Sequence, residues 1–216
     1  MKTTQTDFWE SDFGKEYTER NSHLEMDKWN NYYIERYGKT KLALNEDFLG
    51  HLNKDAKILE VGSNTGMQLR GFQHNGFQHL FGVEIQSYAV KRSRDFVPDA
   101  NVVQGSALDI PFKDGFFDVV GTHYVLIHIS PNDLSTVMDE MYRCSGRYIL
   151  GLEYHADKIT EIGYRGNTNV LWKANYAEMF MQRFPDLKMV KKEILPYLTD
   201  DEKGNVDCMY LLEKAG

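Results

Sequence analysis

The sequence is poor in cysteine, in long apolar runs and in excess positive charge, and each shortage narrows the possible functions. Its 216 residues contain two cysteines, Cys144 and Cys208, which stand far apart and without the spacing of metal ligands. We therefore expect no metal site and a reduced, cytoplasmic setting. No apolar run approaches about 20 residues, and the N-terminal segment lacks the apolar core of an export signal. The sequence thus predicts neither a membrane span nor a secretory leader.

Positive charge is the third shortage. Lys and Arg number 25 against 32 Asp and Glu, for a net charge of −7 at pH 7. Proteins that bind nucleic acid concentrate basic residues to neutralise phosphates. We therefore expect no nucleic-acid partner and a small-molecule substrate, while the oligomeric state stays open.

The length suits one α/β domain with a large core and a small additional element. There is no internal repeat and no low-complexity linker. Because the first apolar strand begins near residue 57, we predict an N-terminal helical cap or lid over residues 1–54 and a main domain over residues 55–216.

The most informative motif is an apolar strand, Ile58–Val61, followed by a loop with glycines at 62 and 66. Such a strand suits a parallel sheet that is buried on both faces, and the glycines let the backbone turn sharply beside a ligand. A dinucleotide-binding loop would carry a third glycine and bring a pyrophosphate close, which Glu60 would repel. The loop therefore indicates a cationic ligand without phosphate, such as S-adenosylmethionine (SAM).

Three further segments follow in the order that such a site needs. The predicted strand 79–84 ends at Glu84, about 20 residues past the loop, where acids hydrogen-bond ribose hydroxyls. Taken alone, Glu84 is better explained as a solvated carboxylate at a strand end, but its spacing from Gly66 favours the ribose ligand. A short strand over residues 101–104 leads into the segment 105–112, which would cover an adenine, and a fourth strand follows at residues 117–122.

This ordered set, from about residue 57 to 153, resembles the class I SAM-dependent methyltransferases. The motifs that carry the resemblance are E-V-G-S-N-T-G, G-V-E, Q-G-S-A-L-D-I-P-F and F-D-V-V. The resemblance implies a Rossmann-like, doubly wound sheet of seven mostly parallel strands with an antiparallel C-terminal hairpin. By resemblance, the methionine end of SAM is lined by Glu60, Gly62, Ser63, Asn64 and Gly66, the ribose by Glu84 and Ile85, and the adenine by Ser106 and Ala107. Many relatives carry an Asp at the position of Ser106, whose hydroxyl can also accept a hydrogen bond.

The N-terminal segment is rich in aromatic residues. Most of them are explained by burial of a cap helix against the sheet, but such a segment can also fold over the cofactor and exclude water. Tyr17 and Arg20 are three residues apart and so share one helical face. We expect this pair to complete the cofactor site, with the planar fork of Arg20 on the SAM carboxylate.

Catalytic groups are expected at the ends of the fourth and fifth strands. Methyl transfer to oxygen or nitrogen releases a proton, and histidine is the natural base near neutral pH. His128 is the first candidate and His123 the second, although either is also explained as a structural histidine bound to backbone. Glu153, Tyr154 and His155 are expected to orient the acceptor or to substitute as the base.

The segment 164–173 is expected to choose the substrate. It is polar and contains glycine, yet it holds two cations and two aromatic residues: Tyr164, Arg165, Trp172 and Lys173. In an acidic protein this combination indicates an anionic or sugar-bearing acceptor, although ordinary surface charges and one buried Trp would explain the same residues. Beyond it we predict a helix over residues 176–184 and a hairpin with strands 188–195 and 206–213, joined by a turn at 200–205.

Four motifs together resemble a narrower group, the methyltransferases associated with pseudaminic acid and related nonulosonic acid biosynthesis. They are F-W-x-x-x-F-G-x-x-Y-x-x-R-N, E-V-G-S-N-T-G, V-L-I-H-I-S-P and Y-R-G-x-x-x-x-L-W-K. The resemblance implies an O- or N-methyltransferase for a small sugar or sugar-nucleotide acceptor. The alternatives are methylation of another small metabolite and a SAM-binding partner protein without turnover.

Overall fold

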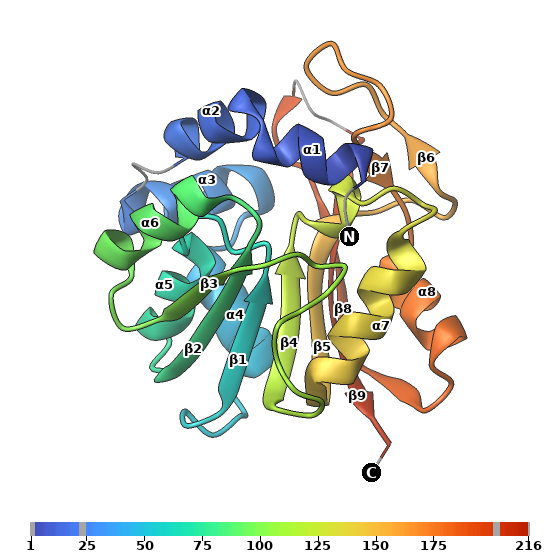
Figure 1. Cartoon of the computed structure of the whole chain (residues 1–216). Coiled ribbons are helices and arrows are strands. Elements are labelled where there is room, and N and C mark those ends of the chain that lie inside the picture. The colour runs from blue at the N-terminus through green and yellow to red at the C-terminus, as the bar shows by residue number, and fades with distance from the viewer. Residues whose placement is uncertain (1–2, 22–24, 201–203, 216) are drawn as a thin grey trace.

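The computed structural model describes residues 3–21, 25–200 and 204–215. Its main strands are β1 (Lys57–Val61), β2 (His79–Glu84), β3 (Asn101–Gln104), β4 (Phe117–His123), β5 (Ser145–Tyr154), β8 (Leu187–Pro196) and β9 (Val206–Lys214). In the described part of the chain they form a seven-stranded sheet in the order β3-β2-β1-β4-β5-β9-β8 (Figure 1). The strands from β3 to β5 are parallel, and β9 runs antiparallel to both of its neighbours. This sheet confirms the predicted α/β fold.

The central strands are apolar because both of their faces are buried. In β1, Leu59 packs into the core on one side of the sheet and Ile58 into the core on the other. In β4, Val120 packs into the same core as Leu59, and Val119 packs into the same core as Ile58. Successive side chains of a strand point to opposite faces, so a strand covered on both sides needs an uninterrupted apolar run.

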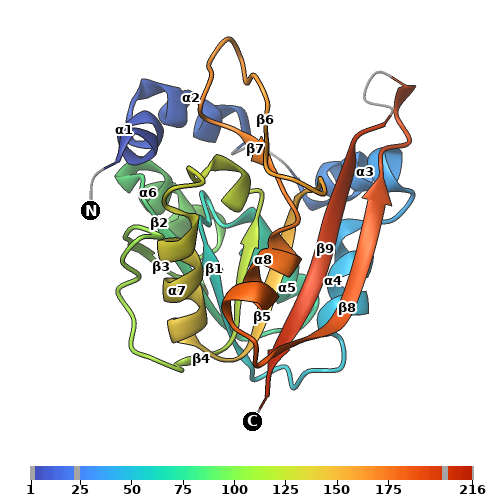
Figure 2. The same ribbon diagram turned by 90° about the vertical axis from the view of Figure 1, so that its right-hand side faces the viewer.

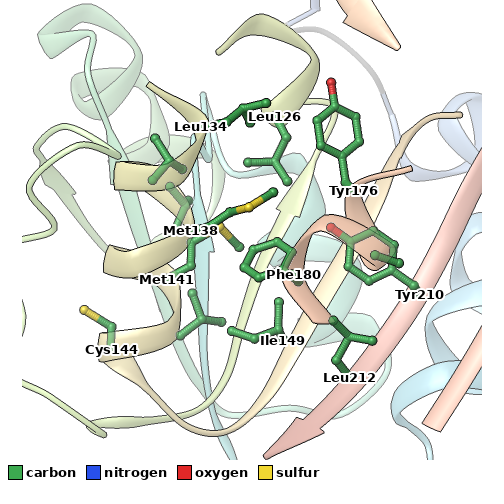
Figure 3. Close-up of a cluster of buried hydrophobic side chains, with 14 of the residues drawn as sticks. Leu126, Leu134, Met138, Met141, Cys144, Ile149, Tyr176, Phe180, Tyr210 and Leu212 are labelled. Atoms are coloured by element: carbon green, nitrogen blue, oxygen red, sulfur yellow. The ribbon is translucent and has the colours of Figure 1, made fainter. Parts of the chain in front are cut away.

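Helices cover both faces. One face carries α3 (Met26–Tyr37), α4 (Lys41–Leu49), α5 (Met67–His74) and α6 (Ser87–Phe96), and the other carries α7 (Leu134–Cys144) and α8 (Tyr176–Arg183). Figure 3 shows the second face, where Met138 of α7 and Phe180 of α8 meet Tyr210 of β9. Cys144, the last residue of α7, is fully buried in this core.

Two short helices, α1 (Thr4–Glu10) and α2 (Asp12–Asn21), lie across the end of the sheet where the parallel strands finish (Figures 1 and 2). Polar contacts hold them there. The Gln86 side chain donates to the Trp9 carbonyl and accepts from Thr18 at 3.2 Å. The Asn64 amide in turn donates to the Thr18 hydroxyl at 3.0 Å. The N-terminal helices are thus bound to the loops that follow β1 and β2.

The segment between β5 and α8 was predicted only as a loop, and it contains a small ladder of β6 (Thr160–Glu161) and β7 (Trp172–Lys173). The predicted turn at residues 200–205 includes 201–203, which lie outside the described residues. None of the described helices is both long enough and apolar enough to cross a membrane.

Candidate functional site

A cavity of about 550 Å³ opens at the carboxyl ends of β1, β2 and β4, where open α/β sheets bind ligands. Its volume is that of a small-molecule site. The loop after β1, the ends of β2, β4 and β5, and the helices α1 and α3 supply the walls. The predicted residues that line it are Tyr17, Glu60, Gly62, Ser63, Asn64, Glu84, Ile85, Ser106, Ala107, His123, His128, Tyr154 and Tyr164.

The glycine loop takes a conformation that ordinary residues rarely adopt. Gly62, Asn64 and Gly66 have φ values of +73°, +47° and +87°. The space around the glycines is equally restricted, because a Cβ at Gly62 would lie 2.5 Å from Val125 and one at Gly66 would lie 2.5 Å from Val97. Gly66 is the N-cap residue before α5 and is not among the residues that line the cavity. The glycines therefore shape the loop, while Ser63 and Asn64 face the ligand space.

Glu84 closes the loop from the neighbouring strand. Its carboxylate accepts hydrogen bonds from the backbone N–H of Asn64 at 2.8 Å and of Gln86 at 2.9 Å. Burial raises its pKa, and these N–H donors oppose that rise. A carboxylate offers about four acceptor positions, so the remaining ones are available to hydroxyls in the cavity.

Glu60 lies deeper, beside His123 and near the fully buried Lys41. The His123 Nδ1 is 3.4 Å from a Glu60 oxygen but without hydrogen-bond geometry. Burial lowers the pKa of His123 well below its usual value and raises that of Glu60, with Lys41 opposing the rise. The second Glu60 oxygen and the Ser63 hydroxyl are buried without partners. Both atoms suit a polar, positively charged ligand group.

His128 has a fixed tautomer. Its Nδ1–H donates to the Val170 carbonyl at 2.9 Å, so the lone pair is on Nε2. The ring contacts Trp9 at a centroid distance of 4.6 Å and Tyr164 at 5.5 Å. Burial lowers the pKa of His128 to about 4, and the bond to Val170 only partly opposes this. His128 is therefore neutral at pH 7.

Tyrosines form the wall beyond β4 and β5. Tyr124, with φ +58°, donates to Asp207 at 2.8 Å, and Tyr37 and Tyr197 donate to the same carboxylate. Asp207 is fully buried behind them. Tyr154 lies next to Tyr124 at a centroid distance of 5.7 Å. The cavity thus has an acidic end at β1 and β2 and an aromatic end at β4 and β5.

The other predicted residues are described but lie outside the lining: Arg20, Gly66, Glu153, His155, Arg165, Trp172 and Lys173. Arg20 is exposed and lies 3.8 Å from Glu16, so this structure does not bring the predicted clamp with Tyr17 together. Glu153 is buried and accepts from the backbone N–H of Val125 and Ile127 at 3.2 and 3.3 Å. It holds the segment that carries His128 rather than facing the cavity.

Of the residues in the predicted acceptor loop, only some reach the cavity. Tyr164 reaches the cavity, whereas Arg165 is exposed with its guanidinium 5.8 Å from the Tyr164 ring centre. Lys173 donates to Asn205 at 2.5 Å. Trp172 is buried, and its carbonyl accepts from the Tyr176 hydroxyl at 3.1 Å. His155 is bound through its backbone N–H to Val206 at 3.0 Å.

Sequence reasoning missed several lining residues, among them Trp9, Arg36, Gln86 and Tyr124. Trp9 was explained by packing, although it stands within a motif that carried the resemblance, and Tyr124 was passed over, although it directly precedes another such motif. Arg36 gave no signal, because a single Arg on a helix is ordinary and only the packing of α3 decides where it lies.

The lining fits the cofactor that the sequence predicts. A buried carboxylate oxygen without a partner at Glu60 suits an ammonium, and the spare acceptor positions of Glu84 suit a pair of ribose hydroxyls.

Comparison with known proteins agrees with this fit. Residues 59–148 match a family described as a methyltransferase domain. An uncharacterized methyltransferase of Synechocystis is 36% identical over 87 residues, which is 40% of this chain and 41% of that protein. The chain covers less than half the length of the curated relatives that it matches.

Solved structures extend the comparison to the fold. The crystal structure of the PH0226 protein from Pyrococcus horikoshii has a TM-score of 0.66 at 14% identity and covers 90% of this chain and 93% of that one. A SAM-dependent methyltransferase from Methanosarcina mazei has a TM-score of 0.63 at 14% identity and covers 76% and 95%. At such identities the likeness establishes the fold alone.

Proposed function

We propose that this chain, which carries a methyltransferase domain over residues 59–148 in the class I fold, is an enzyme that methylates a small acceptor. Its cofactor is SAM, which supplies an electrophilic methyl group when bound. The acceptor atom is an oxygen or a nitrogen that loses a proton during the transfer.

The pair of buried carboxylates at the glycine loop carries this proposal. Glu60 offers a partnerless oxygen to the ammonium of the cofactor, and Glu84 offers acceptor positions to its ribose. A phosphate-containing cofactor would be repelled by both carboxylates, whereas SAM has no phosphate and carries a positive sulfonium.

Among the three catalytic candidates, His128 is the best placed to take the proton. It is neutral at pH 7, and its Nε2 lone pair is left over by the bond from Nδ1 to Val170. His123 faces Glu60 at the acidic end of the cavity. Burial raises the pKa of Tyr154 to about 12, so it stays protonated and orients the acceptor as a hydrogen-bond donor.

The finer part of the proposal is a sugar-derived acceptor of the nonulosonic acid type. Its support is the resemblance of four sequence motifs, together with an aromatic cavity end that suits the apolar face of a sugar ring. Methylation of another small metabolite is the alternative, and the test below distinguishes the two by the identity of the product.

The decisive experiment incubates the protein with SAM and a panel of sugars, sugar nucleotides and other metabolites. S-adenosylhomocysteine (SAH) release and a product heavier by one methylene are expected for one acceptor class. Glu84→Ala should lose this activity, whereas Glu178→Gln, which changes an exposed carboxylate on α8, should keep it. The alternative is a protein that binds SAM without catalysis. It would be supported if the protein binds SAM but turns over no acceptor, and if replacement of His128 leaves this behaviour unchanged.

A further inference from the structure

At the acidic end of the cavity, a buried amide oxygen has no partner in the described part of the chain. It is the Oε1 atom of Gln68, the second residue of α5, which follows the glycine loop. Gln68 is only 5% exposed, yet it belongs to the cavity lining. Buried polar groups are normally hydrogen-bonded, so an unpaired one in a cavity wall indicates a ligand.

A row of buried amides decides which atom of Gln68 is left unpaired. The row begins at the Leu42 carbonyl, which can only accept and takes a hydrogen bond from the Asn75 Nδ2 at 3.1 Å. The Asn75 oxygen then accepts from the Asn45 Nδ2 at 3.3 Å, and the Asn45 oxygen accepts from the Gln68 Nε2 at 3.0 Å. The NH₂ group of Gln68 is therefore turned toward α4, which packs against α5 (Figure 1). This leaves the Oε1 atom for the cavity.

Lys41 stabilises this row without entering the cavity. It is fully buried in α4, it donates to the Asn45 oxygen at 2.8 Å, and it is not among the lining residues. Burial lowers the pKa of Lys41 to about 7, with Glu60 opposing that fall, so its charge is only partial at neutral pH. The place that faces Glu60 from within the cavity is thus left to a ligand.

Glu60 offers the second unpaired acceptor. It is 4% exposed, it lines the cavity, and its Oε2 atom also lacks a partner among the described residues. Glu60 and Gln68 flank the glycine loop, because α5 follows β1 through that loop. The neighbouring His123 ring adds no positive charge, since burial lowers its pKa well below the usual value. Two such acceptors suit a cationic group with several N–H donors.

We propose that the Oε1 atom of Gln68 binds the α-ammonium of SAM together with Glu60, and that Asn45 is a positioning residue that fixes the Gln68 amide. This inference rests on the proposed methyltransferase function and gives its cofactor site a selectivity for the ammonium. A primary ammonium has three N–H donors, which the single unpaired oxygen of Glu60 would leave partly unsatisfied in a buried site.

The test compares two ligands that differ only in this group: SAH and its deaminated analogue, in which a hydrogen replaces the α-amino group. Calorimetric titration of the native protein should show roughly a hundredfold tighter binding of SAH, since hydrogen bonds to a charged group are lost with the amine. Gln68→Met, which keeps the length of the side chain and removes its amide, should reduce this preference by about tenfold. Its affinity for the analogue should change little, whereas a purely structural defect would weaken both ligands alike.

Two further variants complete the comparison. Asn45→Leu should reduce the preference by a smaller factor, because the Gln68 amide is then no longer held in one orientation. Gln73→Met is the matched control, since Gln73 lies on the same helix and donates to Asp99 at 2.7 Å on the exposed side. It should behave as the native protein does.

A preference that survives Gln68→Met in full would overturn the inference, and so would an equal loss of affinity for both ligands. Equal binding of SAH and its analogue by the native protein would overturn it as well. A full preference in Asn45→Leu would refute the positioning role. Each of these results leaves methyl transfer itself, which is measured separately as SAH release, untouched. Failure of the native protein to bind SAH at all would contradict the proposed function instead, so the two failures are distinguishable.

Discussion

At the scale of the residue, a single hydrogen bond decides which nitrogen of His128 is basic. The Val170 carbonyl takes the proton of Nδ1 and leaves the Nε2 lone pair for chemistry. The same burial that keeps this histidine neutral also weakens it as a base, since its pKa falls to about 4. His128 can therefore take a proton only while an acceptor atom is activated beside it.

Replacement of His128 by Ala should lower turnover by roughly 10² to 10⁴, the usual contribution of a positioned base. SAM affinity should change little, because the residue belongs to the acceptor side. His155→Gln is the control, since His155 is outside the cavity lining. Near-normal turnover in His128→Ala would exclude the role and move it to His123 or Tyr154.

The pH dependence of turnover follows from the same pKa. Only neutral histidine accepts a proton, so activity is lost as the pH falls through the folded-state pKa. Burial moves that point from 6.5 to about 4. The pH–rate profile of the native enzyme should therefore show no loss due to His128 between about pH 5.5 and 8. An inflection near 6.5 that disappears in the His128 variant would contradict the buried, neutral state.

At the scale of the element, the segment after β4 depends on a carboxylate from β5. Glu153 accepts from the backbone N–H groups of Val125 and Ile127 in this segment, and burial raises its pKa to about 7. The folded pKa lies above the unfolded one, so ionisation of Glu153 costs stability as the pH rises from about 4.5 through 7.

Glu153→Gln removes this titration. Relative to the variant, the native protein should lose up to roughly 3 kcal/mol of unfolding free energy between pH 4.5 and 8. Urea unfolding at both pH values measures the difference. Turnover should also fall in the variant, because the amide offers one acceptor oxygen to two N–H groups. A stability difference that does not change with pH would refute the raised pKa.

The helices α1 and α2 are a second element on which the site depends. The Trp9 ring contacts the His128 ring edge to face, and the Gln86 side chain is hydrogen-bonded to Trp9 in α1 and to Thr18 in α2. Removal of residues 1–22 should leave the sheet folded but weaken SAM binding. Trp9→Ala should reduce turnover more than SAM affinity. Addition of SAM should protect the native N-terminal segment from proteolysis. Normal SAM binding by the truncated form, together with protease sensitivity of the native protein that SAM does not change, would show that these helices only pack over the sheet and take no part in cofactor binding.

Sequence patterns predicted the elements better than they predicted the cavity. The bounds of β2 and β3 match their predicted ranges, because the apolar pattern of a strand is a local property of the sequence. The side of a helix that reaches a cavity is set by packing between distant segments. Arg20 therefore lies on the surface, and Arg36 lines the site without any local signal.

At the scale of the whole molecule, cofactor binding should appear as stability. A ligand at one hundred times its dissociation constant adds about 2.7 kcal/mol, and each kcal/mol raises the Tm of a chain of this size by roughly 2 to 4 °C. SAH should thus raise the Tm of the native protein by about 5 to 10 °C.

At the same SAH concentration Glu84→Ala should lose roughly half or more of that rise, since removal of a charged partner weakens binding by roughly ten- to a hundredfold. The shift caused by SAH is the quantity to compare, because Glu84 also holds the loop through Asn64 and Gln86 and its loss lowers the Tm directly. If SAH raises the Tm of Glu84→Ala as much as that of the native protein, Glu84 does not bind the ribose.

The backbone of Tyr124 limits how this site can change over generations. Its positive φ favours Gly or Asn, yet neither replaces the hydroxyl that binds Asp207. A single substitution to Gly or Asn therefore relieves the backbone but removes one of the three hydroxyl donors to the buried Asp207, whereas tyrosine keeps both the donor and the strained backbone. A saturation library selected for turnover should retain tyrosine at position 124, and other residues should enter only together with a neutral partner at position 207. We therefore expect substitutions at the two positions, which are 83 residues apart, to occur together.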